Sequence, residues 1–359
     1  GLGVTSATAQ TTISGNLEIT YNAVSNSMTP GNSYRGFGKE SQINVQNKGK
    51  LSNGLDYAAG FSIELDGPDA NVGSTGASGV STGTGVHFEN NYIDLSSGNT
   101  TFTISADHIQ NPDSNPTMLA GFGYIAMDGV ASSGKAGLYP KAVNSPYSSF
   151  GFGLIQTVPG FGKLSALYVP TNATNQGALN DISNDASAAA AEPTVLSGNS
   201  SESAIEIGFI GDFGVPGLTV QAFYNKEDAP DGQTVNKTGK VVAATYVTGP
   251  FSIAADWRQA VGVISNADAA IGGSNKSETV KGKSIGLGYA ISKDLTTSIT
   301  RGKADTNRSG AVQETTDVVA IGYNLGAVTT GLQFKRVEDA IGVAGADAKS
   351  LQFRIGTKF

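Results

Sequence analysis

The chain has 359 residues, with 48 glycines, no cysteine and two histidines, and its formal net charge at pH 7 is -7. Only 39% of the residues are hydrophobic, and no stretch approaches the roughly 20 apolar residues that a membrane helix needs. The lack of cysteine excludes disulfides and thiolate sites, and it suits a protein exported through an oxidising compartment. Because nothing forms a basic face, the negative charge argues against a nucleic-acid partner.

The first nine residues differ from the rest of the chain. The small residues Ala7, Thr8 and Ala9 are typical of the end of a secretory signal, with cleavage before Gln10. An ordinary frayed terminus is the alternative, because the charged and apolar regions of a full signal are not in the sequence. We therefore expect residues 1–9 to be a signal-peptide remnant or a flexible N-terminus, and residues 10–359 to form a single domain.

Five strands are predicted before residue 108. From Thr11 onward apolar and polar residues alternate, which is the pattern of a strand with one apolar face. A second strand is predicted at 37–48 and a third at 55–65. In the third, one parity is shared by Leu55, Tyr57, Ala59, Phe61, Ile63 and Leu65, over a length that can cross roughly 25 Å of hydrocarbon. After a Gly/Ser/Thr-rich loop at 66–85, the fourth and fifth strands are expected at 87–96 and 101–107, joined by a short SSGN turn.

The connection from residue 108 to 144 is the longest one that carries aromatic and charged residues. It contains three prolines and the segment GFGY from Gly121 to Tyr124. A loop of this size in a compact domain is usually functional or disordered. Because its aromatic residues argue against disorder, we expect it to be a functional loop.

The alternation then continues to the end of the chain. Further strands are predicted at 148–158, 163–169, 203–211, 218–225, 240–247, 251–259, 283–291, 295–302, 317–325, 328–336 and 351–359. In the last of these, Leu351, Phe353, Ile355 and Phe359 share one parity while polar residues take the other. This stretch resembles the closing strand of bacterial outer-membrane barrels.

The predicted fold class is all-β, a sixteen-stranded antiparallel transmembrane barrel. Connections after odd strands are long and polar, whereas those after even strands are short, as in a barrel that crosses one membrane with both termini on the periplasmic side. A secreted all-β solenoid or adhesin is the alternative fold. Since lipid offers no partner to backbone amides, the first and last strands must pair. This phasing brings Glu18 and Arg354 close together inside the seam.

Strand number, loop rhythm, the long connection after the fifth strand, the NSPY segment at Asn144 to Tyr147 and the terminal Phe resemble the general diffusion porins of Gram-negative outer membranes. The resemblance implies a homotrimer among outer-membrane lipid and lipopolysaccharide, with the third external loop folded inward to narrow the lumen. It implies that this constriction is formed by loop residues Asp107, Asn111, Asp113, Asn115, Met118, Tyr124 and Asp128.

The inward parity of the predicted strands gives the candidate pore wall. Its residues are Glu18, Glu40, Gln42, Asn44, Asp56 and Glu64 from the first three strands, and the cations Arg258, Lys335 and Arg354 from later ones. Porins of this kind often carry a cluster of arginines on the wall opposite the loop, and the first three strands here lack it. We therefore expect a weak transverse field and weak cation selectivity, since carboxylates in a constriction concentrate cations.

The expected function is passive diffusion of small hydrophilic solutes and ions through a water-filled lumen. A substrate-selective porin with a saturable site on the third loop, or a non-conducting surface adhesin, stays open as an alternative. Enzymatic activity is not expected: His87 and His108 are predicted near each other with Asp107 and Glu89, but no serine nucleophile motif or third histidine accompanies them. No catalytic residue, metal site or cofactor is expected, although calcium on loop carboxylates such as Asp66 and Asp69 remains possible without a supporting motif.

Overall fold

The computed structural model describes residues 9–26, 34–64, 87–106, 108–109, 117, 119–120, 150–170, 203–228, 236–261 and 279–359. The strands are Gln10–Asn26 (β1), Tyr34–Lys50 (β2), Asp56–Glu64 (β3), His87–Ser97 (β4), Thr100–Ala106 (β5), Gly151–Val158 (β6), Gly162–Val169 (β7), Ala204–Gly211 (β8), Leu218–Glu227 (β9), Lys237–Thr248 (β10), Phe251–Val261 (β11), Thr279–Ala290 (β12), Leu295–Thr306 (β13), Glu314–Asn324 (β14), Val328–Glu338 (β15) and Ala348–Lys358 (β16). A short 3₁₀ helix, Ala340–Gly342 (η5), precedes β16. In these described ranges no helix is long and apolar enough to cross a membrane.

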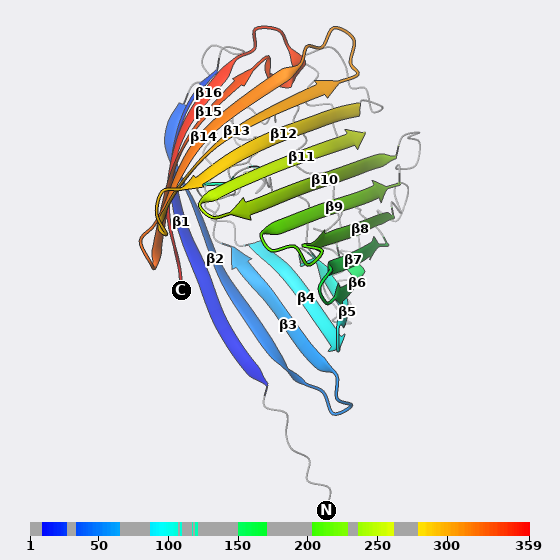
Figure 1. Cartoon of the computed structure of the whole chain (residues 1–359). Helices are drawn as coiled ribbons and strands as arrows, with labels where there is room; N and C mark the ends of the chain where they lie inside the picture. The colour runs from blue at the N-terminus through cyan, green and yellow to red at the C-terminus, as the bar shows by residue number, and fades with distance from the viewer. Residues whose placement is uncertain are drawn as a thin grey trace, which may run out of the picture.

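The sixteen strands form one closed antiparallel barrel, which confirms the predicted fold class. Each strand pairs with its neighbours in the chain, and β1 pairs with β16 to close the cylinder (Figure 1). At the seam, the amides and carbonyls of Gly15 and Phe359 exchange two hydrogen bonds of 2.8 and 3.0 Å. Closure leaves no free strand edge, as a hydrocarbon environment requires.

The connections at the two ends of the barrel differ in length, as predicted. Even strands are followed by tight turns such as 98–99, 249–250 and 325–327, whereas the longest connections, 65–86, 107–150 and 170–203, all follow odd strands. In the turn after β14, the Asn324 side chain accepts a hydrogen bond of 2.9 Å from the Gly326 amide. Gly326 has a φ of 85°, which glycine adopts without the steric cost of a side chain.

Several strands are longer than predicted, and most of the extra residues lie at the end with the long connections. β10 begins at Lys237 instead of residue 240, β12 begins at Thr279 instead of 283, and β13 ends at Thr306 instead of 302. In these extensions the outward side chains are polar or charged: they include Thr238 in β10, Lys281 in β12, and Lys303 and Asp305 in β13. The alternation of apolar residues therefore stops while the strand continues. The apolar pattern therefore marks a band around the barrel and not the full strand length.

The two faces of the barrel wall have the opposite polarity to those of a soluble protein. Large apolar side chains point outward and are exposed; Leu287 and Ile299, for example, are 49% and 54% accessible. The largest fully buried side chains include Arg258 and Lys335, together with Gln333 and three glutamates. This inversion fits a cylinder whose outside contacts lipid and whose inside is polar.

Candidate functional site

The described wall residues of the candidate pore all lie on the inward parity. In β2 and β3, the side-chain amide of Gln42 donates to Glu64 at 3.2 Å, and the Ser62 hydroxyl donates to the Asn44 carbonyl oxygen at 2.6 Å. The side chains of Arg258, Lys335 and Arg354 are buried on the inward faces of their strands. Glu40 faces Glu18 in the strand register, but its side chain lies outside the described part of the chain.

The predicted contact across the seam is present. In the register of β1 and β16, Thr20 faces Arg354 and Glu18 faces Gly356, so Glu18 and Arg354 are diagonal neighbours. The guanidinium of Arg354 forms an ion pair with the carboxylate of Glu18. The strand phasing derived from the sequence is therefore confirmed at the point where the barrel closes.

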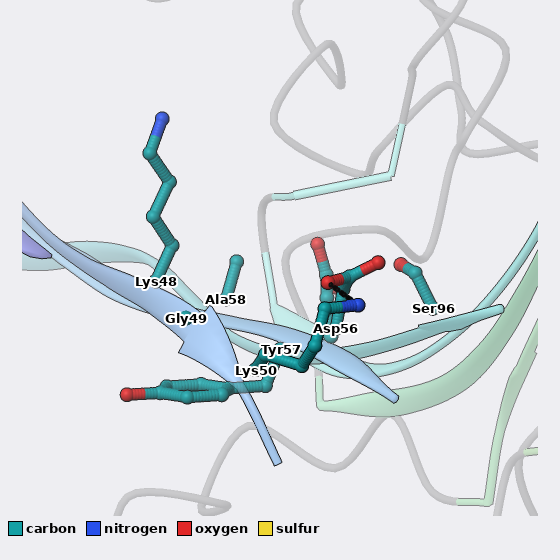
Figure 2. Close-up of a pocket in the computed structure, with 8 residues that line it drawn as sticks. Lys48, Gly49, Lys50, Asp56, Tyr57, Ala58 and Ser96 are labelled. Atoms are coloured by element: carbon teal, nitrogen blue, oxygen red, sulfur yellow. Dashed lines mark ion pairs between the residues drawn. The ribbon is translucent and has the colours of Figure 1, made fainter. Parts of the chain in front are cut away.

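Asp56 lies at the turn end of β3 and is largely exposed, with its carboxylate 2.8 Å from the ammonium of Lys50. This pair lines a hollow of about 560 Å³, together with Lys48, Asp94 and Ser96 (Figure 2). Lys48 and Lys50 share the inward parity of Gln42 and Asn44 but were not among the predicted wall residues. Both lysines would have been predicted as inward residues if the alternation had been followed to the end of β2 at Lys50. The first three strands therefore contribute two inward cations after all.

His108 is held at the end of β5 by partners other than those predicted. Its Nε2 is 2.9 Å from the Asp94 carboxylate, and its ring stacks on Tyr92 with centroids 3.6 Å apart and planes 3° apart. The side chain of His87, its predicted neighbour, lies outside the described residues. Among the residues that the structure describes, no group of three or more His, Asp or Glu is placed to hold a metal ion.

A buried hydrogen-bonded chain connects the inward face of β11 to β12. Arg258 Nε donates to the Asp256 carboxylate at 2.8 Å, and the Ser284 hydroxyl donates to its other oxygen at 2.7 Å. All three side chains are buried. Because buried charges are unfavourable without opposite charges and hydrogen bonds, Asp256 and Arg258 stabilise each other.

The same chain continues into the connection between β5 and β6. The Thr117 hydroxyl is 2.7 Å from that of Ser284, and since Ser284 donates to Asp256, Thr117 is the donor in this pair. The carbonyl of Thr117 accepts a bond of 2.6 Å from the Thr300 hydroxyl on β13. Thr117 is 0% exposed. One residue of the long connection is thus fixed against the inward faces of β12 and β13.

Two glycines on β12 make room for this contact. A Cβ on Gly286 would lie 2.0 Å from the carbonyl oxygen of Thr117, and a Cβ on Gly288 would lie 2.9 Å from the Cβ of Leu119. Both distances are shorter than real Cβ contacts. Glycine at these positions is therefore required for Thr117 and Leu119 to approach the wall.

The predicted constriction residues lie outside the described residues; they are Asp107, Asn111, Asp113, Asn115, Met118, Tyr124 and Asp128. Asp66 and Asp69, the calcium candidates, lie outside them as well. Thr117 was not predicted as a site residue, and no pattern in the sequence distinguishes it from its neighbours.

Further inward charges were missed by the sequence analysis. Glu227 at the end of β9 forms an ion pair with Lys237 at the start of β10, and Glu206 and Glu314 are buried on the inward faces of β8 and β14. Each shares the inward parity of its strand, which was the available signal. The interior wall therefore carries both signs of charge around its circumference.

Comparison with known proteins agrees with the barrel fold described above. The chain matches the model of the Gram-negative porin family over residues 3–342. No curated protein matches the chain in sequence.

Three similar solved structures are also porins or outer membrane proteins. They are an anion-selective porin from Comamonas acidovorans, with a TM-score of 0.66 and 13% identity over 98% of this chain and 100% of that chain; a loop-deletion mutant of OmpT, an outer membrane protein of Vibrio cholerae, with 0.60 and 12% over 98% and 99%; and a triple mutant of the Rhodopseudomonas blastica porin, with 0.58 and 14% over 98% and 100%. At these identities the likeness concerns the fold.

The family match covers nearly the whole barrel, and the sixteen strands close with a polar interior and an apolar exterior. Both observations agree with the architecture of an outer-membrane channel. The chain therefore belongs to the Gram-negative porin family.

Proposed function

We propose that this porin forms a water-filled channel for the passive diffusion of small hydrophilic solutes and ions. The observation that carries the proposal is the inverted polarity of the wall: Arg258, Lys335 and the buried glutamates face the interior, while Leu, Ile and Phe side chains cover the outside. A sixteen-stranded cylinder is too wide for its own side chains to fill, so a polar interior of this size holds water.

The constriction is assigned to the connection between β5 and β6. The contacts of Thr117 with Ser284 and Thr300 support this assignment. They bring the connection, which follows β5, to the inward faces of β12 and β13, and these strands lie across the barrel from β5. Gly286 and Gly288 support it further, since they provide the space that the contact needs. The carboxylates of Asp107, Asp113 and Asp128 would then lie in the narrowest part.

The channel is expected to be weakly cation-selective. Several inward carboxylates are neutralised by wall cations, as in the pairs Glu18–Arg354, Glu227–Lys237 and Asp256–Arg258, which leaves the aspartates of the loop as the main source of selectivity. Lys48 and Lys50 at the turn end oppose this preference. Salt screens such charges with a Debye length of roughly 8 Å at physiological ionic strength, so the preference should be weaker in concentrated salt.

The assembly is expected to be a homotrimer in the outer membrane, with both ends of the barrel chain on the periplasmic side. Two alternatives predict different results. A substrate-selective porin would show saturable flux for one class of solute, and a surface adhesin would show no conductance.

Recording in a planar bilayer tests the proposal. Purified protein added to the bilayer should give discrete conductance steps in groups of three, and a gradient of KCl should give a small reversal potential of the sign set by cation permeation. A clear anion preference would overturn the selectivity, and the absence of channels from folded protein would overturn the function. Solute flux into liposomes that stays proportional to concentration would exclude the saturable alternative.

A further inference from the structure

The hollow at the turn end of β2 and β3 is built from inward residues that lie side by side on three strands. In the strand register Lys48 of β2 faces Ala58 of β3, which in turn faces Asp94 of β4. Neighbouring strands are spaced by about 4.8 Å, so the backbones at Lys48 and Asp94 are about 10 Å apart. Because the side chain between them is only a methyl group, the wall is recessed at Ala58. We call this recess, with its lining residues, the turn-end hollow.

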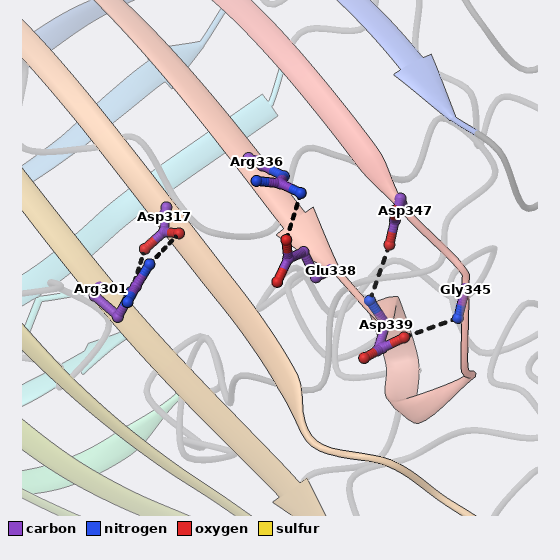
Figure 3. A network of polar contacts seen from close by, with 7 residues as sticks. All are labelled: Arg301, Asp317, Arg336, Glu338, Asp339, Gly345 and Asp347. Carbon is purple, nitrogen blue, oxygen red and sulfur yellow. Dashed lines mark hydrogen bonds and ion pairs between the residues drawn. The ribbon is translucent and has the colours of Figure 1, made fainter.

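The cation on one side of the turn-end hollow is unpaired. Lys48 is exposed, and among the described residues its ammonium group takes part in no hydrogen bond or ion pair. Arginines on the outward wall differ, because Arg301 pairs with Asp317 and Arg336 pairs with Glu338 (Figure 3). The Lys48 ammonium can therefore accept an anionic partner from outside the chain.

The other side of the turn-end hollow carries carboxylates. Asp56 is 60% exposed, and its contact with Lys50 uses one carboxylate oxygen. Its second oxygen has no hydrogen bond or ion pair within the described part of the chain. Asp94 adds a negative group beside it, with one oxygen 2.9 Å from His108. In Figure 2 the Lys48 side chain points away from the Lys50–Asp56 pair, so the unpaired cation and the carboxylates stay separate.

This separation of charge determines which solutes the turn-end hollow favours. A solute with a single charge would be attracted by one side and repelled by the other, whereas a solute with both charges can be attracted by both sides. The volume of about 560 Å³ lies within the range of roughly 300–1,000 Å³ that is common for small-molecule sites. A small zwitterion fits these charges and this size.

We propose that the turn-end hollow is a weak binding site for small zwitterionic solutes, the chemical class of free amino acids. The carboxylate of the solute accepts hydrogen bonds from the Lys48 ammonium, and the ammonium group of the solute donates to Asp56 with Asp94 nearby. The proposal rests on the proposed function, because the hollow faces the water-filled interior. Since Lys48 and Asp56 are exposed, water screens both contacts, and the bound solute exchanges rapidly.

The first test compares three probes of equal chain length on the folded porin in detergent. They are 4-aminobutyrate, which carries both charges, butyrate and butylammonium. Dissociation constants are measured by saturation-transfer NMR, and folding is measured by the heat-dependent gel shift of the barrel. 4-Aminobutyrate should bind about 10-fold more tightly than either probe with a single charge, because only 4-aminobutyrate makes a charged hydrogen bond on both sides.

Two variants assign each charge of the probe to one side of the hollow. Lys48→Gln should weaken 4-aminobutyrate about 10-fold and weaken butyrate, without weakening butylammonium. Asp56→Asn should weaken 4-aminobutyrate to a similar extent and weaken butylammonium, without weakening butyrate. The matched control is Lys163→Gln, an inward lysine at the turn end of β7 that does not line the hollow. It should change each dissociation constant less than about twofold.

The proposal is overturned by equal binding of the three probes, by unchanged binding in either variant, or by equal weakening in Lys163→Gln. A variant that weakens all three probes alike would show an effect on the shape of the hollow and would also overturn it. Conductance of the same preparations separates this proposal from the proposed function. Channels that conduct without preferring the zwitterion would refute the site alone, whereas zwitterion binding without conductance would refute the function and leave the site standing.

Discussion

The inward and outward faces of β11–β13 are two surfaces of the same three strands, and they manage charge in opposite ways. On the inside, Arg258 and Asp256 are buried and paired, and the network extends to Thr117 of the long connection. On the outside, Lys281 and Lys283 are exposed and have no partner among the described residues. Neighbouring residues of one strand therefore face different environments. Whether a charged side chain of these strands is buried and paired depends on the face of the wall on which it lies.

The largest expected effect comes from breaking the inner pair. Asp256→Ala removes the buried carboxylate that accepts hydrogen bonds from Arg258 and from the Ser284 hydroxyl. The free energy of unfolding, measured by urea titration in lipid vesicles, should fall by about 3–5 kcal/mol. A fall of less than about 1 kcal/mol in the free energy of unfolding would mean that the inner charges do not depend on each other. The inner and outer faces would then not differ in how they stabilise charge.

A smaller effect is expected from closing the space on β12. In Gly286→Ala the new Cβ would overlap the carbonyl of Thr117, so Thr117 must move away from the wall. Overpacking of this kind costs about 1–3 kcal/mol, and single-channel conductance should change because the connection is displaced.

Gly356→Ala on β16 is the control for that experiment. A Cβ there would meet no atom closer than 3.4 Å, an ordinary contact. Conductance should therefore stay at the wild-type value. Equal changes in the two variants would mean that glycine replacement alters the barrel in general and that position 286 has no special contact with the connection.

The outer pair Arg301–Asp317 should contribute much less than the inner pair. Both side chains are partly exposed, at 62% and 34%, and exposed ion pairs contribute about 0–1 kcal/mol even when the geometry is good. A double-mutant cycle with Arg301→Gln and Asp317→Asn should give a coupling free energy in this range. A coupling as large as that of Asp256 and Arg258 would remove the distinction between the two faces.

The smallest effect is a pH dependence at Asp228, just beyond β9. Hydrogen bonds from Lys226 and Ser203 hold the pKa of this carboxyl below its usual range. Its stabilisation is therefore present above the unfolded carboxyl pKa, about 3.9, and is lost as the pH falls through the lower folded pKa. In Asp228→Asn the stability should change less between pH 5 and pH 2 than in the wild type, and an unchanged pH profile would refute the role of Asp228.

The sequence was sufficient to predict the strand number, the closure and the contact between Glu18 and Arg354. Those features follow from side-chain parity, which is fixed by the geometry of a strand. The strand ends at the side of the long connections were misplaced in β10, β12 and β13, because the outward residues there are polar or charged and the apolar alternation stops at the edge of the lipid band.

The interior network was harder to predict. Parity alone would have found Asp256, Glu227 and Lys48 as inward residues, but the predicted wall included only some of the charges. The contact of Thr117 with Ser284 joins residues far apart in the chain and depends on the absence of side chains at Gly286 and Gly288. Glycine within a strand also occurs at bulges and tight bends, so the sequence could not identify this contact.

The central claim, that one parity faces water and the other lipid, can be tested directly because the chain has no cysteine of its own. Single cysteines placed at Gln42, Ile43, Asn44 and Val45 of β2 would be treated with a charged, membrane-impermeant thiol reagent during single-channel recording. This arrangement predicts that the current changes for Gln42→Cys and Asn44→Cys and stays constant for Ile43→Cys and Val45→Cys. Current changes at all four positions, or only at the two apolar ones, would contradict it.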